Sequence, residues 1–264
     1  MHRIGDNDNP FRFEEWRSLF EPQRAKPHPG PKSCASEKCT APADNSTAKG
    51  PDQAEIQAPL PVKEMVLALD IVTFMTSTYR ERLKRIDSSV SELQETRRNL
   101  VNKGLIKEVW FGKVLLLAPT AELYAILGMP SPYKRNVWDI HSFLILVAAK
   151  LVETNPLVKH VKTEVSLGDS SSTVDLIAYL KDGNRWACEI IHKGITNVSA
   201  NAAKLQGKGF SQVVFLCTDF NIKQRVWALI RNAGFAPEFQ SVIRCTIFSS
   251  LLRQRKQMIL RDTP

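Results

Sequence analysis

Residues 174–191 read Val174-Asp175-Leu176-Ile177-Ala178-Tyr179-Leu180, then Lys181-Asp182-Gly183-Asn184, then Arg185-Trp186-Ala187-Cys188-Glu189-Ile190-Ile191. The connection with Asp, Gly and Asn is typical of a hairpin turn, so the apolar segments are predicted as adjacent strands. Each strand carries one carboxylate, Asp175 or Glu189. A carboxylate in a buried strand is costly unless it is paired or binds a cation. The two acids are therefore the first candidates for a functional site; the alternative is that they are solvated at one end of a sheet.

The residues around this hairpin predict a mixed α/β domain over residues 138–250. A helix is expected from Trp138 or Asp139 to Glu153. The other expected elements are strands at 160–167, 173–180 and 185–193, a helix at 197–208, a strand at 211–217, a helix at 221–233 and a strand at 241–248. The segment from Val213 to Cys217 is apolar throughout, as in a strand covered on both faces. This order of elements indicates an α/β domain with a mixed sheet.

Residues 61–130 have the element order of a winged helix-turn-helix domain. Helices are predicted at about 63–76, 79–86 and 90–102, and two strands over 105–117 around Gly112 follow them. A short helix after Thr120 closes the segment. The predicted DNA-binding residues are Gln94, Arg97 and Arg98 on one face of the third helix, followed by Lys103 and by Lys113 in the hairpin turn. The alternatives are an ordinary solvated helix face and a surface for protein contact.

The remaining segments are expected to carry little structure of their own. Residues 1–60 are rich in Pro, Ser, Ala, Lys and Asp and are predicted to be a disordered tail. Residues 131–137 are expected to form a linker, and residues 251–264 a basic C-terminal stretch. Cys34 and Cys39 are a close pair, but no second Cys or His pair accompanies them to complete a zinc site.

The charge of the chain indicates a polyanionic partner. Its formal net charge is +9, and residues 131–264 carry 18 basic and 10 acidic side chains. Such a basic folded part favours nucleic acid over a membrane surface. No apolar run approaches the ~20 residues of a membrane span, and the first residues lack the apolar core of a secretion signal. Together with five cysteines in no framework spacing, these features predict a cytoplasmic protein.

The acidic hairpin and the residues after it resemble the PD-(D/E)XK, or restriction-endonuclease-like, nuclease superfamily. More narrowly, residues 65–248 are similar to winged-helix plus nuclease-like modules of plasmids and integrative elements, including tails of conjugation-associated ATPases. The matching residues are His141, Asp175-Leu176, Glu189, Asn201, Lys204, Gly209-Phe210 and Val213-Val214-Phe215. The resemblance implies double-stranded DNA as a partner, and a relaxase or ATPase of a transfer machinery as a second partner.

The resemblance also implies a Mg²⁺ site held by Asp175 and Glu189, with a lysine that orients water or screens the phosphate. The motif places that lysine at Ile191, which has no amine. Lys193 shares the strand face of Glu189, whereas Lys204 projects from the next helix; both are candidates to replace it. Two hypotheses follow: a DNA-binding accessory protein of a mobile element with a degenerate nuclease domain, and an active Mg²⁺-dependent DNA endonuclease.

Overall fold

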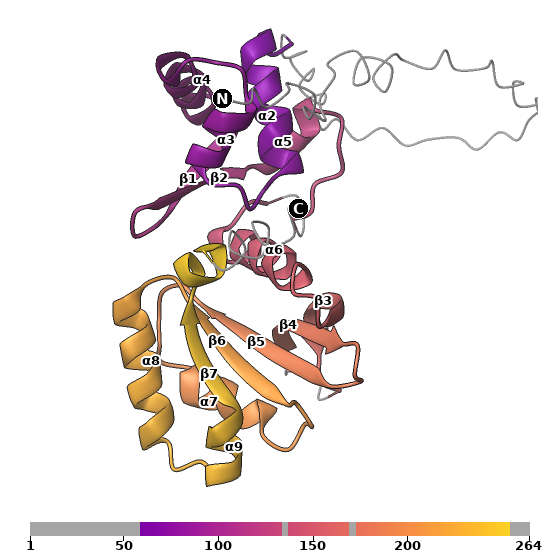
Figure 1. The fold of residues 1–264 in the computed structure, drawn as a ribbon, viewed down its shortest axis with the longest axis vertical. Coiled ribbons are helices and arrows are strands. Elements are labelled where there is room, and N and C mark those ends of the chain that lie inside the picture. The colour runs from indigo at the N-terminus through magenta and orange to yellow at the C-terminus, as the bar shows by residue number, and fades with distance from the viewer. Residues whose placement is uncertain (1–58, 134–136, 169–172, 254–264) are drawn as a thin grey trace, which may run out of the picture. The chain divides into compact units, whose positions relative to one another are not determined.

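The described part of the chain forms a mixed α/β structure with one two-stranded and one five-stranded sheet (Figure 1). The computed structural model describes residues 59–133, 137–168 and 173–253. Nearly all of the predicted disordered tail, including Cys34 and Cys39, lies outside these residues, as does most of the basic C-terminal stretch. None of the described helices is long and apolar enough to cross a bilayer.

The elements before the linker follow the predicted order closely. They are the helices α2 (Val62–Thr73), α3 (Tyr79–Arg85) and α4 (Val90–Asn102), the strands β1 (Ile106–Phe111) and β2 (Val114–Pro119), and the helix α5 (Ala121–Ile126). Thr78 and Ser89 begin α3 and α4 with capping boxes, in which a hydroxyl and a glutamate satisfy free backbone N–H groups. Gly104, at φ 71°, ends α4 in the left-handed conformation that favours glycine.

One basic residue of α3 is buried instead of lying on the helix surface. Arg82 is 0% exposed, although the sequence places it among a row of basic residues along α3 and α4. Its guanidinium pairs with Asp70 of α2 and donates to the carbonyl of Phe74 at 2.8 Å. Arg85 pairs with the other oxygen of Asp70 at 2.6 Å. Because Asp70 is buried too, Arg82 joins α2 to α3 and does not face solvent.

The second half contains the five-stranded sheet. Its elements are α6 (Ile140–Glu153), β3 (Val158–Ser166), β4 (Thr173–Leu180), β5 (Arg185–Ile191), α7 (Val198–Leu205), β6 (Gln212–Cys217), α8 (Phe220–Asn232), α9 (Pro237–Val242) and β7 (Ile243–Ile247). The strand order is β3-β4-β5-β6-β7. The first three strands are antiparallel, whereas β5, β6 and β7 are parallel, so the predicted mixed sheet is confirmed.

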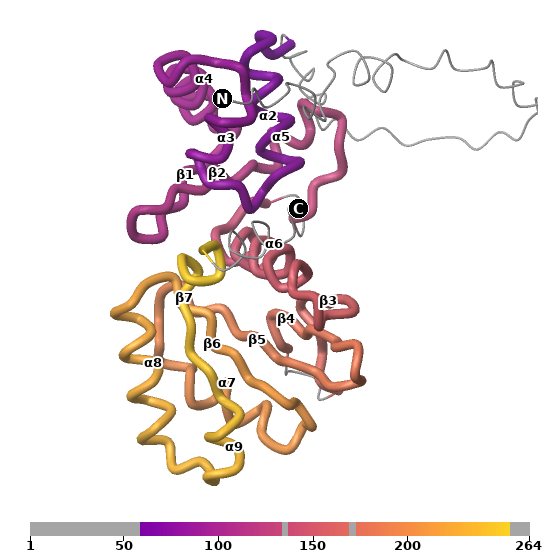
Figure 2. Tube along the Cα trace, in the orientation of Figure 1, coloured from indigo at the N-terminus to yellow at the C-terminus, as the bar shows by residue number. Residues whose placement is uncertain are grey.

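The sheet has different helices on its two faces (Figure 2). Leu176, Ala178 and Ile190 pack with α6 on one face. Ile177 and Ile191 pack with α7 and α8 on the other. This alternation is the period of two that strands impose, and it places β5 between helices on both sides.

The core on the α6 face also includes side chains of the two-stranded sheet and of the last described helical turns. The rings of Phe111 and Phe248 are stacked with centroids 5.0 Å apart. Tyr133, at the start of the predicted linker, is buried and donates from its hydroxyl to the carbonyl of Pro119 at 2.6 Å. The sequence gives no sign that Tyr133 is buried, because the carbonyl of Pro119 comes close to its hydroxyl only in the folded chain.

Several boundaries differ from the predicted ones. The strand expected at 185–193 ends at Ile191, so Lys193 lies beyond it. The helix expected at 197–208 spans Val198–Leu205. The segment before the last strand, for which no element is predicted, contains the short helix α9 with Pro237 at its first position. Proline is compatible with the first turn of a helix, where its missing N–H has no partner to lose.

Candidate functional site

The two acids of the hairpin lie on neighbouring strands where the regular pairing of β4 with β5 ends. The paired residues run from Tyr179↔Arg185 to Leu176↔Cys188. Beyond them, the Asp175 carboxylate accepts the N–H of Ile190 at 2.7 Å. Glu189 is 2% exposed and the Asp175 side chain 19%. Both carboxylates are therefore largely withdrawn from water.

Asp175 occupies an irregular point of the sheet. Val174 and Leu176, two residues apart, join different core clusters, so the alternation of side chains is interrupted between them. Glu164, which lies between the paired residues Thr163↔Leu176 and Val165↔Val174, has φ 49° and is exposed. A residue other than glycine at such a φ is uncommon and marks a local distortion of the strand. The distortion lets Asp175 point along the end of β5 instead of into one of the two cores.

Glu189 has two partners from α7. Asn201 donates from Nδ2 to Glu189 Oε2 at 3.0 Å, and the amine of Lys204 lies 3.0 Å from Oε1 as an ion pair. Oε1 is buried and accepts no hydrogen bond from any residue in the described part of the chain. Burial, and then the charge of Asp175, raises the pKa of Glu189 to about 7, while Lys204 opposes the shift.

Of the two candidate lysines, Lys204 is the one whose amine reaches Glu189. Its amine also donates to the carbonyl of Thr173 at 2.5 Å, and its side chain is 21% exposed. Ile191 is buried in the α7 face of the sheet, and its carbonyl accepts the N–H of Thr218. The site is therefore an Asp–Glu–Lys group in which the lysine comes from a helix.

Two further residues join this group, although the predicted catalytic set omits them. His141, on the first turn of α6, places Nε2 at 3.2 Å from Asp175 Oδ1. That hydrogen bond raises the pKa of His141, which burial opposes. Asn201 is the second. Both are among the residues that carry the resemblance stated from the sequence, and that resemblance was the only signal in the sequence that they would lie near the two acids.

Lys193 is not part of this group. It is exposed beyond the end of β5, and it makes no hydrogen bond or ion pair with Asp175 or Glu189. Over the described ranges, no three His, Cys, Asp or Glu side chains are arranged to hold a metal ion by themselves.

The predicted DNA-binding residues divide into engaged and free side chains. Arg97 pairs with Glu108 at 3.1 Å and lies over the ring of Tyr79. Lys103 pairs with Glu64 at 2.5 Å. Gln94 is half-buried, whereas Arg98 and Lys113 are exposed and pair with no residue that the structure describes. Trp110 of β1, 57% exposed, is a surface aromatic that the sequence prediction does not include.

Comparison with known proteins assigns no relative. No protein-family model matches the chain, and no curated protein and no solved structure matches it.

Proposed function

We propose that the protein is a DNA-associated, Mg²⁺-dependent phosphodiesterase whose site consists of Asp175, Glu189 and Lys204. The observation that supports this proposal is the position of Lys204, whose amine lies 3.0 Å from Glu189 Oε1. Ile191 makes a lysine at the motif position impossible. Lys204 of α7 reaches the same carboxylate. It would therefore supply the amine that a nuclease site needs beside its two carboxylates.

The carboxylates suit a hard divalent cation. The Lys204 amine lies 3.0 Å from Glu189 Oε1, and a carboxylate oxygen has a second lone pair that a cation could use. Burial raises the pKa of Glu189, and the charge of Asp175 raises it further; a cation would relieve that repulsion between like charges. Asp175 and Glu189 would hold the ion, which supplies a more acidic bound water and neutralises charge on a phosphate.

The other residues of the site act by holding and orienting. Asn201 fixes Glu189 Oε2, and the N–H of Ile190 fixes Asp175 Oδ2. The Lys204 side chain is partly exposed and supplies a positive charge at the acids, where a phosphate would bind. His141 Nε2 lies 3.2 Å from Asp175 Oδ1, and this side chain can donate a proton there when it is protonated.

DNA contact is assigned to residues 61–130 as a winged helix. The proposal is supported by the order of α2, α3, α4 and the β1–β2 hairpin, and by the exposed cations Arg98 and Lys113. By the resemblance to modules of mobile elements, the DNA would belong to a plasmid or integrative element. A relaxase or ATPase would then be the protein partner.

Cleavage of plasmid DNA with Mg²⁺ or Mn²⁺ tests the proposal. The wild-type chain is expected to nick or linearise supercoiled DNA, and Asp175→Ala is expected to abolish the reaction. Lys204→Ala should lower the rate by about 10²–10³, the usual cost of removing a charge that stabilises a transition state. Lys193→Ala is the matched control and should cleave at the wild-type rate, because Lys193 does not contact the acids.

Loss of activity in Lys193→Ala together with full activity in Lys204→Ala would overturn the assignment of the lysine. A second function is favoured by the burial of Glu189 and its raised pKa, which make cation binding costly near neutral pH. In that case the protein is a non-catalytic DNA-binding accessory factor. It would then retard duplex DNA in a salt-sensitive manner and cleave it with neither metal.

A further inference from the structure

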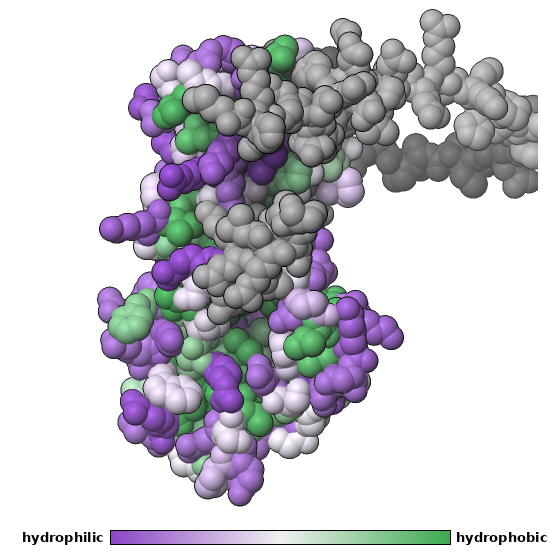
Figure 3. Space-filling model, in the orientation of Figure 1, coloured by the Kyte–Doolittle hydropathy of each residue, from purple (hydrophilic) through white to green (hydrophobic). Residues whose placement is uncertain are grey.

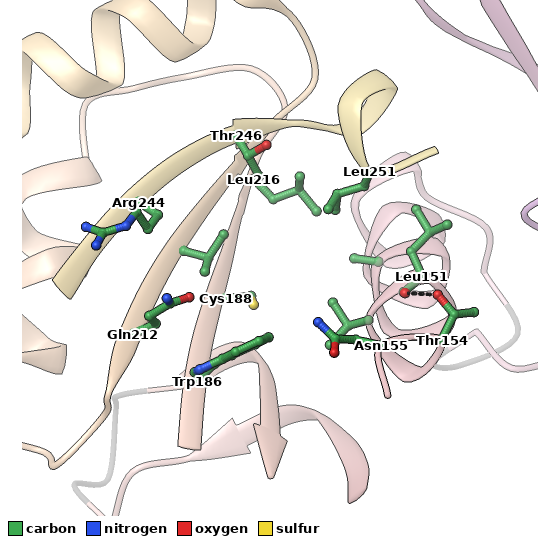
Figure 4. A pocket seen from close by; sticks show the side chains of 13 residues that line it. Leu151, Thr154, Asn155, Trp186, Cys188, Gln212, Leu216, Arg244, Thr246 and Leu251 are labelled. Carbon is green, nitrogen blue, oxygen red and sulfur yellow. Dashed lines mark hydrogen bonds between the residues drawn. The ribbon is translucent and has the colours of Figure 1, made fainter. Parts of the chain in front are cut away.

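A groove lies on the α6 face of the sheet, away from the Asp–Glu–Lys group. It has a volume of about 270 Å³ and runs between α6 and the strands β5, β6 and β7 (Figure 4). Its wall and floor include Leu151 of α6, Val214 and Leu216 of β6, Leu251 and the ring of Trp186. In the space-filling view, hydrophobic residues are visible over the strands in the lower part of the picture (Figure 3). Most of the groove is therefore an apolar hollow in a sheet face that α6 covers only in part.

Polar side chains gather at the end of the groove where β5 and β6 begin. Trp186 and Gln212 are partners in the parallel pairing of β5 with β6, so their side chains lie next to each other on one face of the sheet. Asn155, just after α6, lies on the other side of the indole ring (Figure 4). The half-buried Gln212 amide forms no hydrogen bond with any residue in the described ranges. This end of the groove thus combines a flat aromatic ring with an amide whose donor and acceptor have no partner there.

The charge of the lining favours an uncharged ligand. Arg244 is the only charged side chain among those that line the groove. Its guanidinium donates to the carbonyls of Ser241 and Ile243, and it points away from the groove (Figure 4). A phosphate or carboxylate would therefore find no free cation inside. A sugar would leave several of its hydroxyls on the apolar floor, where they would lack hydrogen-bond partners. The ligand that fits is flat, with apolar faces and a polar edge.

The volume limits the size of that ligand. Pockets for drug-sized ligands usually measure about 300–1,000 Å³ and combine an apolar lining with a few polar groups that fix the orientation. This groove has the same kind of lining, but at about 270 Å³ it lies just below that range. It therefore has room for a small ring system and not for a whole nucleotide. Stacking on an aromatic side chain is the usual way in which a protein holds such a ring when it is a nucleobase.

We propose that the groove binds an adenine base, which stacks on Trp186 and meets the amide of Gln212 with its amino edge. A glutamine amide matches adenine in two hydrogen bonds, because the N6 amino group donates to the amide oxygen and N7 accepts from the amide nitrogen. Guanine has two acceptors at the same edge, so the same amide would leave one of them unpaired. The sugar and phosphate would extend into solvent, so the base can belong to a free nucleoside or to an unpaired nucleotide of a DNA strand. The groove does not depend on the Asp–Glu–Lys group, because Lys204 reaches Glu189 from α7 on the other face of the sheet.

Titration of the full chain with adenosine, without divalent cation, tests the proposal. The indole N–H signal of Trp186 in NMR spectra is expected to shift along a saturable curve, and its loss in Trp186→Leu assigns it. Purine riboside, which is adenosine without the amino group, should bind about tenfold more weakly, because it leaves the oxygen of the Gln212 amide unpaired. Single-stranded oligo(dA) distinguishes the two sources of the base. Tighter binding of oligo(dA) than of adenosine would assign the groove to a DNA strand, and tighter binding of adenosine would assign it to a free nucleoside.

A second variant separates loss of the contact from loss of folding. Gln212→Leu keeps the side-chain volume, and it should weaken adenosine binding about tenfold while leaving the affinity for purine riboside unchanged. The matched control Gln206→Leu, at an exposed glutamine outside the groove, should change neither affinity.

Two results would overturn the proposal. One is a Trp186 signal that shifts with neither adenosine nor oligo(dA). The other is equal affinity of the wild-type chain for adenosine and purine riboside, because Gln212 would then not recognise the base. Since the titration contains no divalent cation and measures no cleavage, either result would leave the proposed phosphodiesterase activity unaffected.

Discussion

At the scale of single residues, the properties of Glu189 depend on where it is buried. The same carboxylate on an exposed strand would titrate normally, but here burial and the charge of Asp175 raise its pKa to about 7. Its partners Asn201 and Lys204 both come from α7. The folded state therefore binds a proton at Glu189 between about pH 4.5 and 7, a range in which the unfolded chain has released it.

This raised pKa predicts a pH-dependent stability. Because the folded state holds the extra proton on Glu189, the free energy of unfolding falls as the pH rises through this range. Above pH 7 the buried, ionised carboxylate of Glu189 destabilises the folded state. We expect Glu189→Gln to raise the free energy of unfolding at pH 8 on the order of 1 kcal/mol, with a smaller gain at pH 5. Thermal melts without divalent cation measure this. The exposed control Glu153→Gln should show neither change, and an equal effect of Glu189→Gln at both pH values would contradict the explanation.

At the scale of elements, α4 carries cations with different roles. Arg97 connects α4 to β1 through Glu108 and to α3 through the Tyr79 ring, whereas Arg98 makes no such contact with a described residue. The two arginines are adjacent in sequence, but successive residues point about 100° apart on a helix, so only one of them packs against the hairpin. Of the two arginines, Arg98 is therefore the one that we expect to contact the proposed DNA partner.

This difference gives a paired prediction for duplex binding. Arg98→Ala and Lys113→Ala should each weaken DNA binding by about threefold to tenfold, with little effect on stability, because each removes one phosphate contact. Arg97→Ala should instead lower the melting temperature, through the loss of its contacts with Glu108 and Tyr79. Gel retardation and thermal melts of the three variants separate these effects. Unchanged binding in the double variant of Arg98 and Lys113 would remove the DNA-binding role from α4 and the hairpin.

At the scale of the whole molecule, we expect the excess of basic side chains to govern binding to the proposed DNA partner. The formal net charge is +9. Such a charge attracts the phosphates of DNA without any side chain contacting a base. Neutralising phosphates releases counterions, so affinity falls linearly with the logarithm of salt concentration. We expect duplex binding to weaken by at least about 100-fold between 50 and 200 mM salt. Fluorescence anisotropy over this range measures how affinity depends on salt concentration. An affinity that does not change with salt would show that the net charge does not contribute to binding.

The sequence by itself determined the α/β class, the mixed sheet and most element boundaries. These depend on local signals, such as the period of two in β4 and β5, the Thr78 and Ser89 caps, and Gly183 in the hairpin turn. It did not anticipate the burial of Arg82, because Asp70 becomes its partner only when α2 and α3 pack. Nor did it choose between Lys193 and Lys204. Strand parity allowed Lys193, but β5 ends at Ile191 and α7 carries Lys204 to Glu189. The tertiary structure decided that point, because the distance between side chains of different elements depends on how a helix packs on a sheet, which no local pattern encodes.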